Sequence, residues 1–160
     1  MTILSHVPPD VLALAERLRA AGKKSWVVGG CVRDSLLGRK VADWDLATEA
    51  SPEEVMKIFP RAIPTGIQHG TVTVVHNKVH YEVTTLRGET TYSDGRRPDA
   101  VQFVEEITRD LARRDFTINA IALDPTTGVI VDPFDGQKDL ASKVIRAVGK
   151  PFERFSEDGL

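Results

Sequence analysis

Two aspartates separated by one tryptophan, Asp43 and Asp45 in the stretch ADWDLAT, are the first residues whose types and spacing suggest chemistry. The stretch predicts a strand by its alternation, and residues i and i+2 of a strand share a face, with Cα atoms about 6.5 Å apart. Two such carboxylates repel each other, and a hard divalent cation, chiefly Mg²⁺, suits them as oxygen ligands. The alternative is a pair of ordinary exposed acids at a strand end. The neighbours predicted to face the core are Ala42, Trp44 and Leu46.

Glu82 is a candidate third carboxylate. It lies in VHYEVTTL, where alternation places Glu82 on one face of a strand together with His80 and Thr84. Val79, Tyr81 and Val83 then form the opposite face. Glu82 joins the two aspartates if its strand lies beside theirs; otherwise it belongs to a solvated strand face.

A glycine pair precedes the aspartates in WVVGGCVRD, which predicts a strand, a turn at Gly29 and Gly30, and a short helix. Glycines permit a tight turn and close backbone approach, and the N–H groups that begin a helix attract anions. Arg33, in the first helical turn, adds a cation suited to phosphate. The pattern is neither a dinucleotide fingerprint nor a P-loop, and a glycine pair alone is most often merely a turn. Together with the aspartate strand that follows, it indicates a triphosphate held beside a metal pair.

A third element is RRDFTIN, residues 113–119, in which two arginines precede Asp115. Phe116 and Ile118 indicate that this segment is partly buried, which would direct its arginines toward a cleft; the alternative is a run of surface charge. A second arginine pair, Arg96 and Arg97, lies in a loop without apolar periodicity and is expected to be solvated or to contact RNA or nucleotide.

Composition limits the possible classes of protein. The chain has 160 residues, one cysteine and a net charge of −2, which excludes a disulfide framework, a cysteine zinc site and a global basic surface for nucleic acid. The four histidines show no paired ligand spacing, and Cys31 is expected to be a packing residue. No apolar run is long enough to span a membrane, so we expect a cytoplasmic protein with no membrane partner.

The pattern of elements predicts a single α/β or α+β domain without a doubly wound sheet. Amphipathic spacing, caps and turns predict helices over 8–22, 31–38, 51–59, the first half of 107–123, and 135–141. Alternation predicts strands over 25–28, 43–48, two within 70–87 hinged near Asn77, 101–104, a hairpin over 123–134, and 144–149. Residues 88–100 read as a loop.

Four motifs, in order, resemble those of the tRNA nucleotidyltransferase/poly(A) polymerase family, class II, over the chain from about residue 25 onward. The resemblance implies the head domain of that family, with a nucleotidyltransferase (DNA polymerase beta-like) fold and a mainly antiparallel sheet. It implies Asp43 and Asp45 as Mg²⁺ ligands and, with Glu82, as the catalytic carboxylates. It implies substrate binding by Gly29, Gly30 and Arg33 at the triphosphate and by Arg114, Asp115 and Asn119 in the ribose motif.

The last two motifs concern the C-terminal part of the chain. DLASKVIR, Asp139–Arg146, resembles the element that joins head to neck, and EDGL resembles the start of the base-reading motif, with Glu157 and Asp158 as substrate-binding residues. We expect residues 1–24 to form an N-terminal helix, 25–148 the catalytic head, and 149–160 the start of a truncated neck. The arginine that completes the base-reading motif would be residue 161.

The resemblance implies a Mg²⁺-dependent enzyme that adds CCA, or its terminal A, to the 3′ end of tRNA from CTP and ATP and releases pyrophosphate. One ion would lower the pKa of the RNA 3′-hydroxyl, and the other would steady the leaving pyrophosphate. The open alternatives are a poly(A) polymerase and a head that binds nucleotide or RNA without elongating it. Oligomeric state does not follow from the sequence.

Overall fold

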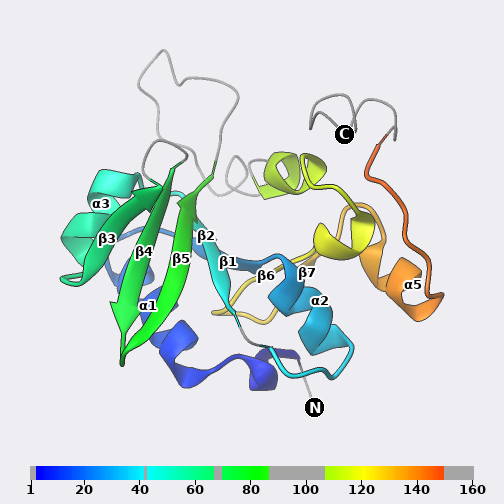
Figure 1. Cartoon of the computed structure of the whole chain (residues 1–160), viewed down its shortest axis with the longest axis horizontal. Coiled ribbons are helices and arrows are strands. Elements are labelled where there is room, and N and C mark those ends of the chain that lie inside the picture. The colour runs from blue at the N-terminus through cyan, green and yellow to red at the C-terminus, as the bar shows by residue number, and fades with distance from the viewer. Residues whose placement is uncertain (1–2, 42, 67–69, 87–106, 150–160) are drawn as a thin grey trace.

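Seven strands form one sheet in the order β3-β4-β5-β2-β1-β6-β7 (Figure 1). The computed structural model describes residues 3–41, 43–66, 70–86 and 107–149. The strands are β1 (Ser25–Val28), β2 (Asp45–Thr48), β3 (Ala62–Gly66), β4 (Thr71–His76), β5 (Val79–Thr85), β6 (Ala122–Leu123) and β7 (Ile130–Val131). Neighbouring strands are antiparallel except β2 and β5, which are parallel. The predicted mixed, mainly antiparallel α/β architecture is confirmed.

Helices cover both faces of this sheet. They are η1 (Ile3–His6), α1 (Pro9–Ala20), α2 (Gly30–Leu36), α3 (Pro52–Ile58), η3 (Thr117–Asn119), α5 (Gly136–Ala141) and a helical segment over residues 107–112. In Figure 1, α1 and α3 lie behind β3, β4 and β5 at the left, and α2 and α5 lie at the right. The helical segment over residues 107–112 covers the opposite face of the sheet. Among the described residues, no helix is long and apolar enough to cross a membrane.

Two apolar clusters explain why both sheet faces are covered. The larger joins α1 and α3 to one face through Leu14, Leu18 and Phe59, all almost fully buried. The smaller lies on the opposite face and joins β1 and β2 to the 107–112 helix, through the buried residues Trp26, Val28, Ala47, Ile107 and Leu111. The second cluster holds the segment around residue 114 against the sheet, which matters for the site below.

The predicted strand over 43–48 is partly wrong, because β2 begins only at Asp45. Val28 of β1 and Glu82 of β5 both pair with Asp45, and β1 ends there because Gly29 turns away with φ 87° and ψ −155°. Asp43 precedes the ladder and is exposed. Trp44 and Leu46 are buried as predicted, whereas Ala42 lies outside the described residues.

The predicted strand over 144–149 is also wrong. Its one sheet-like contact in the described part of the chain is an isolated bridge between Phe116 and Ala147. The bridge consists of two backbone bonds, from Thr117 N to the Arg146 carbonyl at 2.9 Å and from Val148 N to the Asp115 carbonyl at 3.0 Å. A side-chain contact adds to it, because Arg146 Nε donates to Asp139 Oδ2 at 3.1 Å. Strand β3 was not predicted, since Pro64 interrupts its pattern, but proline is tolerated on an edge strand. The expected strand at 101–104 and the loop at 88–100 lie outside the described residues.

Candidate active site

The parallel pairing of β2 with β5 sets Asp45 directly beside Glu82. Burial raises the pKa of the Asp45 carboxyl, the charge of Glu82 raises it further, and Arg114 acts in the opposite direction. Asp43 adds a smaller upward shift to the same pKa. The three candidate carboxylates therefore share one electrostatic environment, in which the ionised form of Asp45 is disfavoured and a cation would be stabilising.

Gly29 brings the backbone close to this pair. Its φ of 87° and ψ of −155° belong to a region that is essentially restricted to glycine. A β-carbon at this position would lie 3.7 Å from Asp45 Oδ2 and 3.6 Å from Arg114 Nη1. The turn thus lies between the aspartate motif and the ribose-type motif, which are 69 residues apart in sequence (114 − 45).

Arg33 and its partners form the second half of the site. Arg33 Nη1 donates to Asn119 Oδ1 at 2.7 Å, and Arg33 Nε donates to Asp34 Oδ1 at 3.0 Å. A β-carbon on Gly30 would lie 3.1 Å from Arg33 Nη2, so the glycine leaves room for the guanidinium. Because α2 has only seven residues, the charge of Arg33 carries more of any phosphate affinity than the helix dipole does.

Asn119 and Asp115 extend this contact. Asp115 Oδ1 accepts from Asn119 Nδ2 at 3.2 Å and from the Phe116 backbone N–H at 2.7 Å. Arg33, Asn119 and Asp115 therefore form one hydrogen-bonded chain across residues that are far apart in sequence. This chain aligns the candidate phosphate contact with the candidate ribose contact.

Arg114 lies between these groups and the carboxylates. Its Nη2 faces Asp110 Oδ2 at 3.4 Å, and its buried Nε has no hydrogen-bond partner among the described residues. Asp110 was missed at the sequence level, although it lies four residues before Arg114, the spacing at which helix side chains meet. Arg114 Nη1 lies on the side of the Gly29 turn, where a β-carbon would be 3.6 Å away from it.

Asp139 and Thr117 were also missed as supports of the site. Thr117 Oγ1 donates to the buried Asp139 Oδ2 at 2.6 Å, and this contact fixes the segment that carries Asn119. Little in the sequence indicates this pair, because Asp139 lies 22 residues after Thr117 and no local pattern links the two. Glu157, Asp158, Arg96 and Arg97 lie outside the described residues.

Cys31 lies close to the candidate site but is buried. Its Sγ donates to the Val28 carbonyl at 3.0 Å, and burial raises the pKa of its thiol to about 11. A thiol with that pKa is protonated at neutral pH, which suits the expected packing role.

The acidic side chains of the site suit a divalent metal that takes only one or two ligands from the protein. Within the ranges that the structure describes, no three histidine, cysteine or acidic side chains are gathered into a metal-binding group. Mg²⁺, however, is commonly held by one or two carboxylates, with substrate phosphates and water completing its coordination. The mutual repulsion around Asp45 fits such an open site.

Comparison with known proteins shows the family to which this chain is related. The model of the poly A polymerase head domain matches residues 25–146. A curated CCA-adding enzyme from Ligilactobacillus salivarius is 50% identical over 99% of this chain and 40% of its own length. One from Geobacillus sp. is 53% identical over 93% of this chain and 37% of its own length. The chain thus spans about two fifths of the length of these relatives.

Solved structures give the same picture. The crystal structure of a Bacillus stearothermophilus CCA-adding enzyme in complex with CTP matches with a TM-score of 0.80 and 44% identity, over 96% of this chain and 37% of that chain. A Thermotoga maritima CCA-adding enzyme complexed with tRNA matches with a TM-score of 0.76 and 27% identity, over 98% of this chain and 37% of that one.

Proposed function

Because this chain belongs to the family of poly A polymerase head domains, we propose that it is the nucleotide-transfer head of an enzyme that adds CCA to the 3′ end of tRNA. Its substrates are CTP, ATP and the tRNA 3′ end, and pyrophosphate leaves. The relatives with 50% identity are CCA-adding enzymes, which supports this choice over a poly(A) polymerase. The single observation that carries the proposal is the Asp45–Glu82 pair beside the Gly29 turn and the Arg33–Asn119–Asp115 chain.

Asp43 and Asp45 would hold Mg²⁺, and Glu82, which pairs with Asp45 in the sheet, would complete the carboxylate group. When bound, the metal ions activate the attacking hydroxyl and neutralise charge on the leaving pyrophosphate. The protein's own contribution is positioning. Gly29 and Gly30 let the phosphates approach the backbone, and Arg33 binds them through its remaining donors.

Asp115, Asn119 and Arg114 would bind the ribose. Asn119 is held between Arg33 and Asp115 by hydrogen bonds, and Asp115 is exposed. A site built to hydrogen-bond a hydroxyl rejects the deoxy analogue, because its polar groups are then left unpaired. Glu157 and Asp158 would read the base, and a cytoplasmic location, where tRNA is processed, completes the proposal.

The test is a transfer assay with the full-length gene product. A tRNA lacking CCA is incubated with Mg²⁺ and with CTP, ATP, GTP or UTP singly and together, and the products are sized. We expect two additions from CTP, then one from ATP, and no further growth. A long homopolymer from ATP alone would identify a poly(A) polymerase, and no product from any acceptor would identify a non-elongating head.

Two variants assign the chemistry to this site. Asp45→Ala and Asp43→Ala should each abolish transfer, since loss of a metal-binding acid removes several kcal/mol of transition-state stabilisation, an effect on the order of 10³-fold or more. The matched control is Asp135→Asn, an exposed acid at the start of α5 whose left-handed φ of 56° suits asparagine. Substantial transfer by Asp45→Ala would remove the carboxylate from the mechanism.

A further inference from the structure

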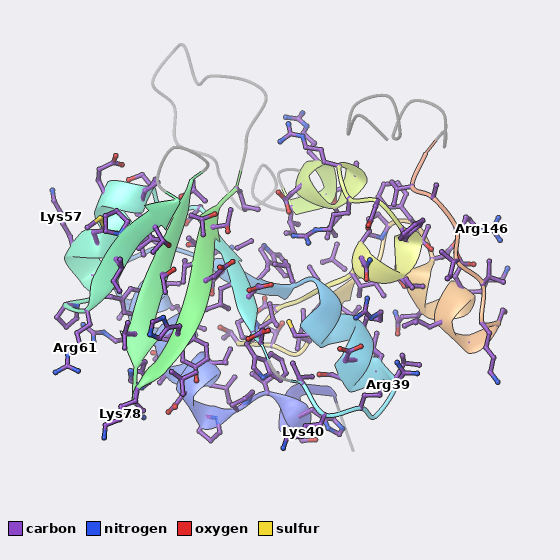
Figure 2. The ribbon with its side chains drawn as sticks, in the orientation of Figure 1. Arg39, Lys40, Lys57, Arg61, Lys78 and Arg146 are labelled. Carbon is purple, nitrogen blue, oxygen red and sulfur yellow. The ribbon has the colours of Figure 1, made fainter. Side chains whose placement is uncertain are left out.

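Four cations gather at one corner of the molecule, away from the candidate active site. We call them the basic corner: Arg17 of α1, Lys57 of α3, Arg61 before β3, and Lys78 in the β4–β5 turn. Figure 2 shows Lys57, Arg61 and Lys78 along one margin, with Arg146 at the opposite side. In the part of the chain that the structure describes, none of the four forms an ion pair with a carboxylate.

Two of the four cations, Arg17 and Arg61, line a groove of about 290 Å³. The rest of its lining is Phe59, Pro60, Val74, Val75, His76 and Asn77, the last of which directly precedes Lys78. The Arg17 guanidinium lies 5.3 Å from the centre of the Phe59 ring and donates to the Ile58 carbonyl at 2.7 Å. These contacts fix Arg17 without neutralising its charge. An anion in this groove would meet positive charge on a rigid wall.

The turn that carries Lys78 is rigid as well. Asn77 and Lys78 have φ of 49° and 65°, the left-handed pair of a two-residue hairpin turn. Asn77 Nδ2 donates to Asp10 Oδ1 at 2.9 Å, and His76 Nε2 lies 3.6 Å from the same oxygen. Asp10 thus pairs with residues in and next to the turn rather than with any of the four cations. Glu53, an exposed acid one helical turn before Lys57, forms no ion pair with it among the described residues.

We propose that the basic corner binds the phosphate backbone of the RNA substrate upstream of its 3′ end. This chain has a net charge of −2, so any RNA backbone that contacts this part of the protein must do so at a local group of cations. The inference rests on the proposed function, because that function supplies the RNA. It adds a contact surface on the α1–α3 side of the sheet, separate from the nucleotide site.

Geometry sets the length of RNA that can reach both places. Lys78 precedes Glu82 by four residues of β5, which corresponds to about 14 Å at the rise of a strand. One strand of a nucleic-acid duplex advances about 3.4 Å per nucleotide, so an RNA needs at least about four nucleotides to cover this distance. An acceptor much shorter than that reaches the carboxylates but not the basic corner.

The test compares salt dependence of RNA binding by the full-length gene product. Arg61→Gln/Lys78→Gln removes two corner charges, and Lys138→Gln/Lys143→Gln removes two from α5 and the residues just after it, on the opposite side in Figure 1. Affinity for a tRNA lacking CCA is measured by fluorescence anisotropy between 50 and 200 mM salt. Each phosphate contact contributes about 0.7–0.9 to the slope of log K against log salt.

We expect the slope of the corner variant to be smaller in magnitude by about 1.4–1.8. Raising the salt from 50 to 200 mM should therefore weaken RNA binding by the wild type by a factor about ten times larger than the factor for the variant. The α5 variant should keep the wild-type slope. In transfer assays, the KM for tRNA should rise in the corner variant, with the KM for CTP and the rate on a three-nucleotide acceptor unchanged. An unchanged slope, or equal losses in both variants, overturns the inference. Absence of transfer by the wild type overturns the proposed function instead, whereas the anisotropy slopes still decide the role of the corner.

Discussion

Replacing Asp45 with asparagine keeps the shape of the side chain and removes its charge. Like charges directly opposite on neighbouring strands are destabilising, and cross-strand charge effects amount to about 0.2–1 kcal/mol. In the absence of divalent metal at pH 7, the free energy of unfolding of Asp45→Asn should therefore exceed that of the wild type by about 0.2–1 kcal/mol. For a chain of this size the melting temperature should rise by about 0.4–4 °C.

The sign follows from the pKa of Asp45, which burial and the charge of Glu82 raise above its unfolded value. As the pH rises from about 4, the unfolded chain releases this proton before the folded chain does. The carboxyl thus lowers the stability of the folded state once the pH passes through that window. Asparagine cannot ionise, so the variant should lack this loss of stability.

Magnesium should make the wild type more stable than Asp45→Asn, which reverses the order expected without metal. A metal bound at a hundred times its dissociation constant stabilises the folded wild type by about 2.7 kcal/mol, and Asp45→Asn should lose most of that gain. The assay is thermal unfolding of this chain with a chelator and with a Mg²⁺ series, with Asp135→Asn as the charge-matched control. Equal stabilisation of both proteins by Mg²⁺, or a less stable Asp45→Asn in chelator, would refute the reasoning.

Three further outcomes are expected. Gly136→Ala should cost about 2–3 kcal/mol in urea unfolding, because its β-carbon would lie 2.2 Å from the Thr117 carbonyl oxygen, which cannot yield easily. Asp115→Ala should reduce discrimination against dCTP and dATP by about tenfold or more in competition assays, since the ribose hydroxyl loses its partner. Lys23 holds the pKa of Glu54 at about 2, so stability should fall as the pH drops from 4.5 toward 2, and Glu54→Gln should flatten this part of the pH profile.

Local patterns predicted most elements well. The Ser51 cap predicted α3, and the structure contains the full capping box, with Glu54 N donating to Ser51 Oγ and Glu54 Oε1 accepting from Ser51 N. The predicted hinge near Asn77 is the β4–β5 turn. These features depend on contacts between near neighbours, which sequence spacing records directly.

The assembly of the site depends on long-range pairing, which spacing does not record. Alternation placed Glu82 on a polar strand face, but only the parallel register of β5 with β2 puts it beside Asp45. Alternation also extended β2 back to Asp43, although β1 ends at Val28 and provides no partner for that residue. Likewise, no local rule links Arg33 to Asn119, 86 residues away.

The most direct test of the central claim is a crystal structure of the full-length protein with CTP and Mn²⁺ in place of Mg²⁺, in which anomalous scattering locates the metal. The account predicts metal ligated by Asp43 and Asp45 at about 2.0–2.3 Å, with the triphosphate between that metal and the Arg33 guanidinium. Metal and triphosphate bound away from these side chains would contradict it.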